Sequence, residues 1–249
     1  MERVAAQRYV GLMSLTERML RPLLSSSGAR PALTHYDDAE GSRIELSVVT
    51  LANWAAKTAN WLVEEFDVEP GDAVAVDLPA HWQTAGVLFG AWWCGAHVVT
   101  DPAEAAVTFV TPPHAAQAAA TGPTAVVALD PLGRGLSSTP PDGALDYLSE
   151  ARTCGDDFAS LLPVPGTTPA LLGTSVDELL ALARQRATAL GVGEGDRVLS
   201  TREWTLPDGA VDALLAPVVA GAHVVQVTHA EPAKVEAHRD AERVTVTLP

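Results

Sequence analysis

The residues with the clearest capacity for chemistry are a glycine and two threonines in a row, Gly166, Thr167 and Thr168. A glycine lets backbone N–H groups crowd around phosphate oxygens, and threonine hydroxyls add donors, so such a triplet is able to hold an anion. Pro165 and Pro169 flank the triplet. Each proline removes one backbone donor and fixes φ near about −65°. No lysine lies nearby in the sequence, so we favour a turn without a ligand over an anion site.

The seven histidines form no pattern typical of a catalytic or metal site. His97 and His223 occupy equivalent positions in the internal repeat described below. This equivalence favours a shared structural role, because one active site needs only one of them. His229 and His238 are loosely spaced near the end of the chain and form no His-Glu-x-x-His arrangement. We therefore predict no metal site there.

The two cysteines also suggest no catalytic centre. Cys94 lies in an apolar stretch, where a thiol behaves as a small hydrophobe, and Cys154 has no catalytic signature around it. Two cysteines are too few for a disulfide framework and suit a reducing cytoplasm. The sequence also has no Gly-x-Ser-x-Gly elbow and no dinucleotide fingerprint. We therefore assign no catalytic residue.

The charge balance excludes two classes of partner. Sixteen basic residues face 31 acidic ones, giving a net charge of −15 and a pI of 4.7. Such a chain has no basic stripe to neutralise phosphates, so we expect no nucleic acid and no anionic membrane as partner. The longest apolar stretch, 85–99, is shorter than the roughly 20 residues of a membrane span. The N-terminus carries charge from Glu2 onward, so we predict no signal peptide and a cytoplasmic location.

An internal duplication organises the chain. The stretch 68–99 opens with Val-x-x-Gly-Asp-x-Val and closes with Gly-Ala-His-Val-Val, and 192–225 does the same. In each copy a short strand precedes a helix whose apolar residues recur at i, i+3, i+4 and i+7. Glycines at Gly95 and Gly221 are expected to end these helices. We expect Pro217 to kink the second helix, because proline lacks the backbone donor.

The same order of elements predicts the fold class. A helix precedes each copy, over 51–66 and over 176–190, the second opened by a capping box at Ser175 and Glu178. Helices that alternate with strands favour parallel sheets covered by helices. We therefore predict an α/β fold of two related halves, 1–162 and 163–249, joined in one compact unit. The loop predicted over 162–173 marks the boundary between them.

The order of these pieces resembles the N-terminal domain of the adenylate-forming enzymes, the family of acyl-CoA synthetases, luciferase and nonribosomal-peptide adenylation domains. Members open with an Arg-Pro-Ala-Leu-like strand, then Gly-Asp-x-Val, then a helix that ends in Gly-Ala. The resemblance covers nearly all of the chain. The matching positions are Arg30, Pro31, Ala32, Leu33, Gly71, Asp72, Val74, Gly95 and Ala96.

The resemblance implies where a site would lie. Gly166, Thr167 and Thr168 match the Gly-Thr-Thr of the family's phosphate loop, which implies ATP or AMP with Mg²⁺ as ligand, but the loop's lysine is missing. Further on, the family shapes its acyl pocket with residues that match Trp204, Asp208 and Gly209, whereas its usual histidine is Leu206 here. The motifs that hold adenine, magnesium and ribose, and the C-terminal domain with its catalytic lysine, do not occur in this sequence.

We therefore expect a shortened, degenerate adenylate-forming domain, a pseudoenzyme that binds an acyl or nucleotide-like ligand or a protein partner. Two alternatives stay open. One is a reduced ATP-dependent acyl-adenylate-forming ligase that a separate subunit completes. The other is a structural module that forms a homodimer and covers apolar surface and sheet edges.

Overall fold

The computed structural model describes residues 12–248, which fold into two compact units. Within the described part, unit 1 comprises residues 12–18, Ala52–Leu78 and Gly86–Leu179. Unit 2 comprises Met19–Leu51, Pro79–Ala85 and residues 180–248. Each unit holds one sheet and the Gly-Asp and Gly-Ala-His ends of one copy of the sequence repeat, whereas Pro79–Ala85 of the first copy belongs to unit 2. The N-terminal residues on which the signal-peptide prediction rests lie outside the described part.

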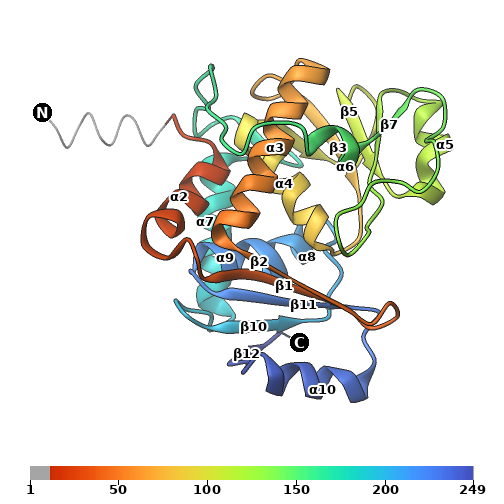
Figure 1. Cartoon of the computed structure of the whole chain (residues 1–249). Helices are drawn as coiled ribbons and strands as arrows, with labels where there is room; N and C mark the ends of the chain where they lie inside the picture. The colour runs from red at the N-terminus through yellow and green to blue at the C-terminus, as the bar shows by residue number, and fades with distance from the viewer. Residues whose placement is uncertain (1–11, 249) are drawn as a thin grey trace, which may run out of the picture. The chain divides into compact units, whose positions relative to one another are not determined.

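The described helices and strands follow the predicted alternation (Figure 1). The helices are α2 (Leu15–Ser27), α3 (Val48–Phe66), α4 (Trp82–Cys94), α5 (Ala115–Ala119), α6 (Tyr147–Ala151), α7 (Val176–Ala189), α8 (Asp208–Ala210), α9 (Ala216–Val219) and α10 (Pro232–Ala241). The strands are β1 (Pro31–Asp37), β2 (Ser42–Ser47), β3 (Ala73–Asp77), β4 (His97–Val99), β5 (Val107–Val110), β6 (Thr124–Val126), β7 (Ala144–Asp146), β8 (Pro169–Leu171), β9 (Thr174–Ser175), β10 (Arg197–Ser200), β11 (His223–Thr228) and β12 (Val246–Thr247).

Unit 1 is built on a seven-stranded sheet in the order β7-β6-β5-β3-β4-β8-β9. All neighbours are parallel except β8 and β9, which form an antiparallel pair. Helix α4 connects β3 to β4, and α5 connects β5 to β6. Apolar residues of α5 and of β5, β6 and β7 share one buried cluster, which includes Val110, Ala115 and Val126. The helices therefore cover the sheet as the α/β prediction requires.

Unit 2 is built on a five-stranded sheet in the order β12-β10-β11-β1-β2. The first four strands are parallel, and β2 returns antiparallel to β1. Tyr36, Leu199, Val225 and Val227 form the buried cluster on this sheet, and Val235 of α10 packs against it. The lower part of Figure 1 shows α10 running past these strands. The predicted fold class, two related α/β halves with mostly parallel sheets, is thus confirmed.

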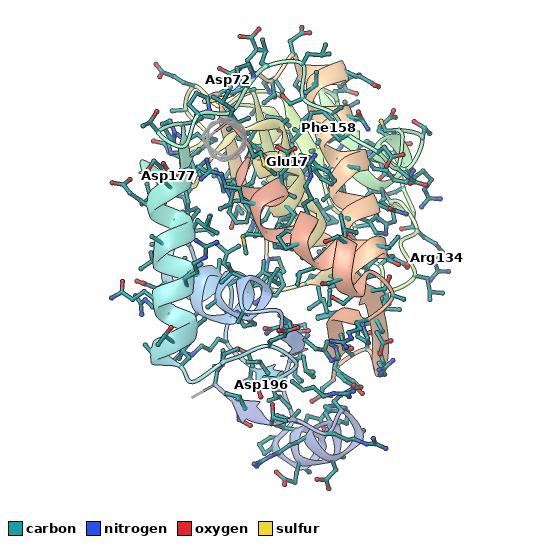
Figure 2. The ribbon with its side chains drawn as sticks, turned by 90° about the vertical axis from the view of Figure 1, so that its left-hand side faces the viewer. Glu17, Asp72, Arg134, Phe158, Asp177 and Asp196 are labelled. Atoms are coloured by element: carbon teal, nitrogen blue, oxygen red, sulfur yellow. The ribbon has the colours of Figure 1, made fainter. Side chains whose placement is uncertain are left out.

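The duplication extends to individual hydrogen bonds. The N–H of His97 donates to the carbonyl of Asp72 at 2.8 Å, and the N–H of His223 donates to the carbonyl of Asp196 at the same distance. Each aspartate side chain also accepts a backbone N–H three residues earlier in the chain, at 2.8 Å and 2.7 Å. Figure 2 labels both aspartates. The repeated residues therefore form the same turn in each unit.

The glycines of the repeat have the backbone angles that this turn requires. Gly95 has φ of 87° and Gly221 has φ of 76°, and both follow the last turn of a helix. This left-handed region is costly for residues with a side chain, so glycine ends the helix there. The predicted helix ends are confirmed.

Three details go beyond what was predicted from the sequence. The chain before Pro217 forms a π-helical turn, Val211–Leu215, between α8 and α9. Such turns are typical where the regular ladder is interrupted, and proline lacks one donor of that ladder. The segment expected as a loop over 162–173 contains β8, because its backbone pairs with β4. The two compact units divide within α7, and residues 19–51 belong to unit 2, where β1 pairs with β11.

Within residues 12–248, no helix is both long enough and apolar enough to cross a membrane.

Candidate functional site

The Gly-Thr-Thr triplet lies on a tight turn in unit 1, folded against the start of α7. The N–H of Thr168 donates to the carbonyl of Pro165 at 2.9 Å and closes the turn. The carbonyls of Thr168 and Gly166 accept the N–H groups of Val176 and Asp177, at 3.0 Å and 2.9 Å. The loop and the first turn of the helix are therefore tied together by backbone bonds. The capping box predicted at Ser175 and Glu178 is confirmed beside them.

The carboxylate of Asp177 occupies the space in front of Gly166. A side-chain Cβ built on Gly166 would overlap both carboxylate oxygens of Asp177. Figure 2 labels Asp177 on the first turn of α7. In the adenylate-forming enzymes that the sequence resembles, the matching glycine belongs to the loop that binds phosphate oxygens. In this protein, the oxygens next to Gly166 are those of the Asp177 carboxylate.

Arg18 supplies a positive charge that sequence reasoning missed. Its guanidinium forms an ion pair with Asp177 and donates from Nε to the carbonyl of Met13 at 2.9 Å. The Arg18 side chain is 8% exposed, whereas that of Asp177 is 62% exposed. The remaining nitrogen, Nη2, is buried and has no hydrogen-bond partner among residues 12–248. Arg18 is distant from the loop in sequence, so no local motif could have signalled its position.

These residues do not fit a nucleoside triphosphate. The N–H of Thr168 already donates a hydrogen bond within the turn, and Pro165 and Pro169 have no N–H to donate. A polyphosphate at this loop would face the Asp177 carboxylate at close range, and like charges repel each other. In the described part of the chain, no group of three or more His, Cys, Asp or Glu side chains is placed to hold a metal ion. We therefore derive no adenylation step through this loop.

The second set of candidate residues lies in unit 2 and divides between core and surface. Trp204 is buried, and its Nε1 donates to the amide oxygen of Gln226 on β11 at 3.0 Å. Asp208 is exposed and forms an ion pair with Arg186 of α7 at 2.8 Å. Gly209 is buried against the carbonyl of Glu203, where a Cβ would overlap. Trp204 therefore faces the core and Asp208 faces solvent.

The histidines equivalent in the repeat have the structural contacts expected of them. The Nε2 of His97 accepts the N–H of Gly173 at 2.7 Å. The Nε2 of His223 lies 2.9 Å from the hydroxyl of Thr34, a buried contact. Burial lowers the pKa of both imidazoles. Each ring thus ties the first residue of a parallel strand to a neighbouring segment, β4 to the β8–β9 turn and β11 to β1.

The two histidines near the end of the chain bind carboxylates of unit 2. His229 contacts Asp37 at 2.9 Å, and His238 of α10 contacts the buried carboxylate of Asp38 at 2.8 Å. The ring of His238 also stacks on Tyr36 at 3.9 Å. These pairs attach the C-terminal helix to the end of β1.

Neither thiol has the environment of a nucleophile. Burial raises the pKa of Cys94 to about 12. Burial and the charge of Glu64 raise the pKa of the half-buried Cys154 as well. A nucleophilic cysteine needs a lowered pKa. Both cysteines therefore behave as ordinary side chains of unit 1.

Replacing Asp177 by asparagine is expected to turn the loop into a weak anion site. The variant Asp177→Asn keeps the shape of the side chain but leaves the Arg18 guanidinium uncompensated. Because Asp177 is largely exposed and screened by water, we expect a loss of only about 1 kcal/mol in unfolding free energy. Added sulfate should then restore stability, which thermal unfolding in sulfate and in chloride would measure.

Wild-type protein is the control for this measurement, because sulfate stabilises most proteins by exclusion from their surface. The expected result is a larger sulfate effect in the variant than in the wild type. Equal effects in the two proteins would show that Asp177 does not occupy an anion position.

No family model matches the sequence. A curated protein of Mycobacterium tuberculosis, described as a TIGR03089 family protein, is 44% identical over 242 residues. The match covers 94% of this chain and 98% of that protein.

Three solved structures are similar in fold. The acyl-CoA synthetase of Brucella canis has a TM-score of 0.78 and 15% identity, covering 94% of this chain and 47% of that one. The acetoacetyl-CoA synthetase of Streptomyces lividans has a TM-score of 0.74 and 19% identity, with coverages of 94% and 42%. The anthranilate CoA ligase AuaEII in complex with anthranoyl-AMP has a TM-score of 0.68 and 17% identity, with coverages of 86% and 45%. The chain spans less than half the length of each of these proteins, and at such identities the likeness shows the fold alone.

Proposed function

Since the chain belongs to the TIGR03089 family and has the fold of the N-terminal part of adenylate-forming enzymes, we propose that it acts by binding and not by forming an acyl adenylate. The observation that carries the proposal is the Asp177 carboxylate in front of Gly166. The negative charge of this carboxylate lies where an adenylate-forming enzyme would bind the negatively charged phosphates of ATP.

The charges around the loop support the same proposal. Catalysis of phosphoryl or adenylyl transfer depends on fixed positive charge directed at the phosphates. Here Arg18 is already paired with Asp177, the carboxylate in front of Gly166. The flanking prolines further reduce the number of donors. The loop then serves to link β8 and α7 to the N-terminal segment.

The proposal gives the domain a protein or small-molecule partner within the cytoplasm, where its two free cysteines would stay reduced. The competing function is a reduced ligase completed by a separate subunit. The buried Nη2 of Arg18 is the observation that favours it, because this guanidinium nitrogen has no partner among residues 12–248 and can donate to an anion.

Calorimetric titration separates these functions. We expect no binding of ATP with Mg²⁺, and none of a non-hydrolysable acyl-adenylate analogue, with Kd below about 1 mM. An active acyl-CoA synthetase titrated in the same buffer provides the positive control. Exchange of labelled pyrophosphate into ATP, measured with a panel of carboxylic acids, should likewise stay at background.

Micromolar binding of either ligand would contradict the proposal and favour the reduced ligase. In that case Arg18→Met and Asp177→Asn should change the affinity in opposite directions. If the affinity is unchanged in both variants, the ligand occupies a different site.

A further inference from the structure

A groove of about 630 Å³, lined by apolar residues and carboxylates, lies on the surface of unit 1. It is bounded by the last turn of α3, by the turn 67–70 and by the segment 158–162. We call it the acidic groove, defined by its lining residues Val63, Glu64, Asp67, Glu69, Phe158 and Leu161. None of these residues belongs to the Gly-Thr-Thr loop or to the Trp204 group.

The segment 158–162 presents large apolar side chains to solvent. Leu161 is 96% exposed and Leu162 is 45% exposed. Phe158, labelled in Figure 2, is held by an edge-to-face contact with Trp93 of α4 at 6.2 Å. An anchored aromatic ring beside exposed leucines is typical of a surface that another molecule covers.

Charges in the acidic groove have one sign. Its described lining includes Glu64, Asp67 and Glu69 and contains no lysine, arginine or histidine. Lys57, on the same helix, is committed to Asp156 at 2.9 Å and to the carbonyl of Cys154 at 2.7 Å. The electrostatic potential in the groove is therefore negative, and it favours a cationic ligand.

This chemistry excludes several occupants. A second copy of this chain brings a net charge of −15 and does not complement the carboxylates. Nucleic acid and anionic lipid carry the same sign of charge as the groove. A segment with leucine-like side chains on one face and lysines or arginines on the other satisfies both the apolar floor and the acidic rim.

We propose that the acidic groove is the docking site for a basic amphipathic segment of a partner protein. This inference rests on the proposed function, since it names the class of partner that a binding domain of this kind would take.

Binding of a synthetic helical peptide tests the proposal. The probe is a fluorescently labelled 14-residue peptide of leucine and lysine at helical spacing, measured by anisotropy without any nucleotide. Leu161→Asp should weaken binding by about 10-fold or more, because it places a charge at the apolar contact. The triple variant Glu64→Gln, Asp67→Asn, Glu69→Gln should weaken binding by about 10-fold at low salt and reduce its salt dependence.

A matched variant controls for the charge of the whole chain. Glu40→Gln, Glu203→Gln, Asp240→Asn removes the same three charges from exposed positions of unit 2. It should change the affinity by less than about 2-fold if binding is local to the groove. The same peptide with glutamate in place of lysine should not bind.

Two results would overturn the proposal. One is the absence of peptide binding to the wild type at millimolar concentration. The other is an equal loss of affinity in the two triple variants with no effect of Leu161→Asp, which would indicate attraction by net charge alone. Both results are independent of the nucleotide titration, so failure of the groove and failure of the proposed function are distinguishable.

Discussion

Replacing Gly90 by alanine is expected to lower the unfolding free energy by about 2–3 kcal/mol, because the new methyl group has no space. Gly90 lies on α4 where this helix crosses α3, and Figure 1 shows the two helices side by side. A Cβ on Gly90 would overlap the Cβ of Thr58 and would lie 2.9 Å from the carbonyl oxygen of Ala55. The contact is with backbone and with a β-branched residue, so neither neighbour can rotate away. Urea unfolding followed by circular dichroism would measure the loss.

Gly86→Ala, one turn earlier on the same helix, is the matched control. A Cβ there would meet the Cβ of Trp54 at 3.4 Å and the hydroxyl of Tyr147 at 3.6 Å, which are ordinary contacts. Because alanine favours helix over glycine by up to about 1 kcal/mol, this variant should be neutral or more stable than the wild type. A Gly90→Ala variant as stable as Gly86→Ala would mean that α3 and α4 do not approach as closely at Gly90 as the structure shows.

The two copies of the repeat differ at this position, since the residue five places before the closing glycine is Gly90 in one copy and Ala216 in the other. Ala216 is fully buried, so its small size still matters there. The requirement for glycine at this position is therefore specific to the packing of α3 against α4 and is not part of the repeated pattern.

The sequence predicts most of the fold because the fold is encoded locally. Periodic apolar positions determine α3, α4 and α7, and the Gly-Asp turn with its closing Gly-Ala-His determines how each helix returns to the sheet. These signals depend on residues within a few positions of each other. The pairing of β1 with β11, in contrast, joins residues nearly 200 positions apart, and no local pattern specifies it. For this reason, the pairing of these two strands could not be predicted from the sequence.

The candidate site was predictable only in part, for the same reason. The position of the Gly-Thr-Thr turn followed from its own residues and their resemblance to a family motif. The positive charge that pairs with Asp177 beside this turn comes from Arg18, on an element distant in sequence. Asp177 looked like an ordinary first-turn carboxylate of α7, where acidic residues are common. Only the three-dimensional arrangement places its oxygens against Gly166.

Acidification from pH 7 to pH 4 is expected to cost unit 2 about 3 kcal/mol of unfolding free energy through His35 alone. The ring is 1% exposed, and burial lowers its pKa to about 4, an effect that Asp37 opposes and His229 strengthens. Its Nε2 contacts the hydroxyl of Thr228 at 3.0 Å, its Nδ1 is buried without a partner, and the ring of His81 lies 4.4 Å away. No acceptor is therefore placed to stabilise a second proton.

The sign follows from which state binds the proton. Between pH 6.5 and pH 4 the unfolded chain protonates this histidine and the folded chain does not, so stability rises with pH across that window and is constant with respect to His35 above it. The variant His35→Gln should remove most of this slope, leaving a smaller one of the same sign from His97 and His223, whose pKa values burial also lowers. Urea unfolding at several pH values would measure both slopes, and NMR titration of the His35 ring would locate its pKa directly. A midpoint near 6.5, or an unchanged slope in His35→Gln, would show that the ring is hydrated in the folded state, and the buried contact with Thr228 would then not anchor β1 to β11.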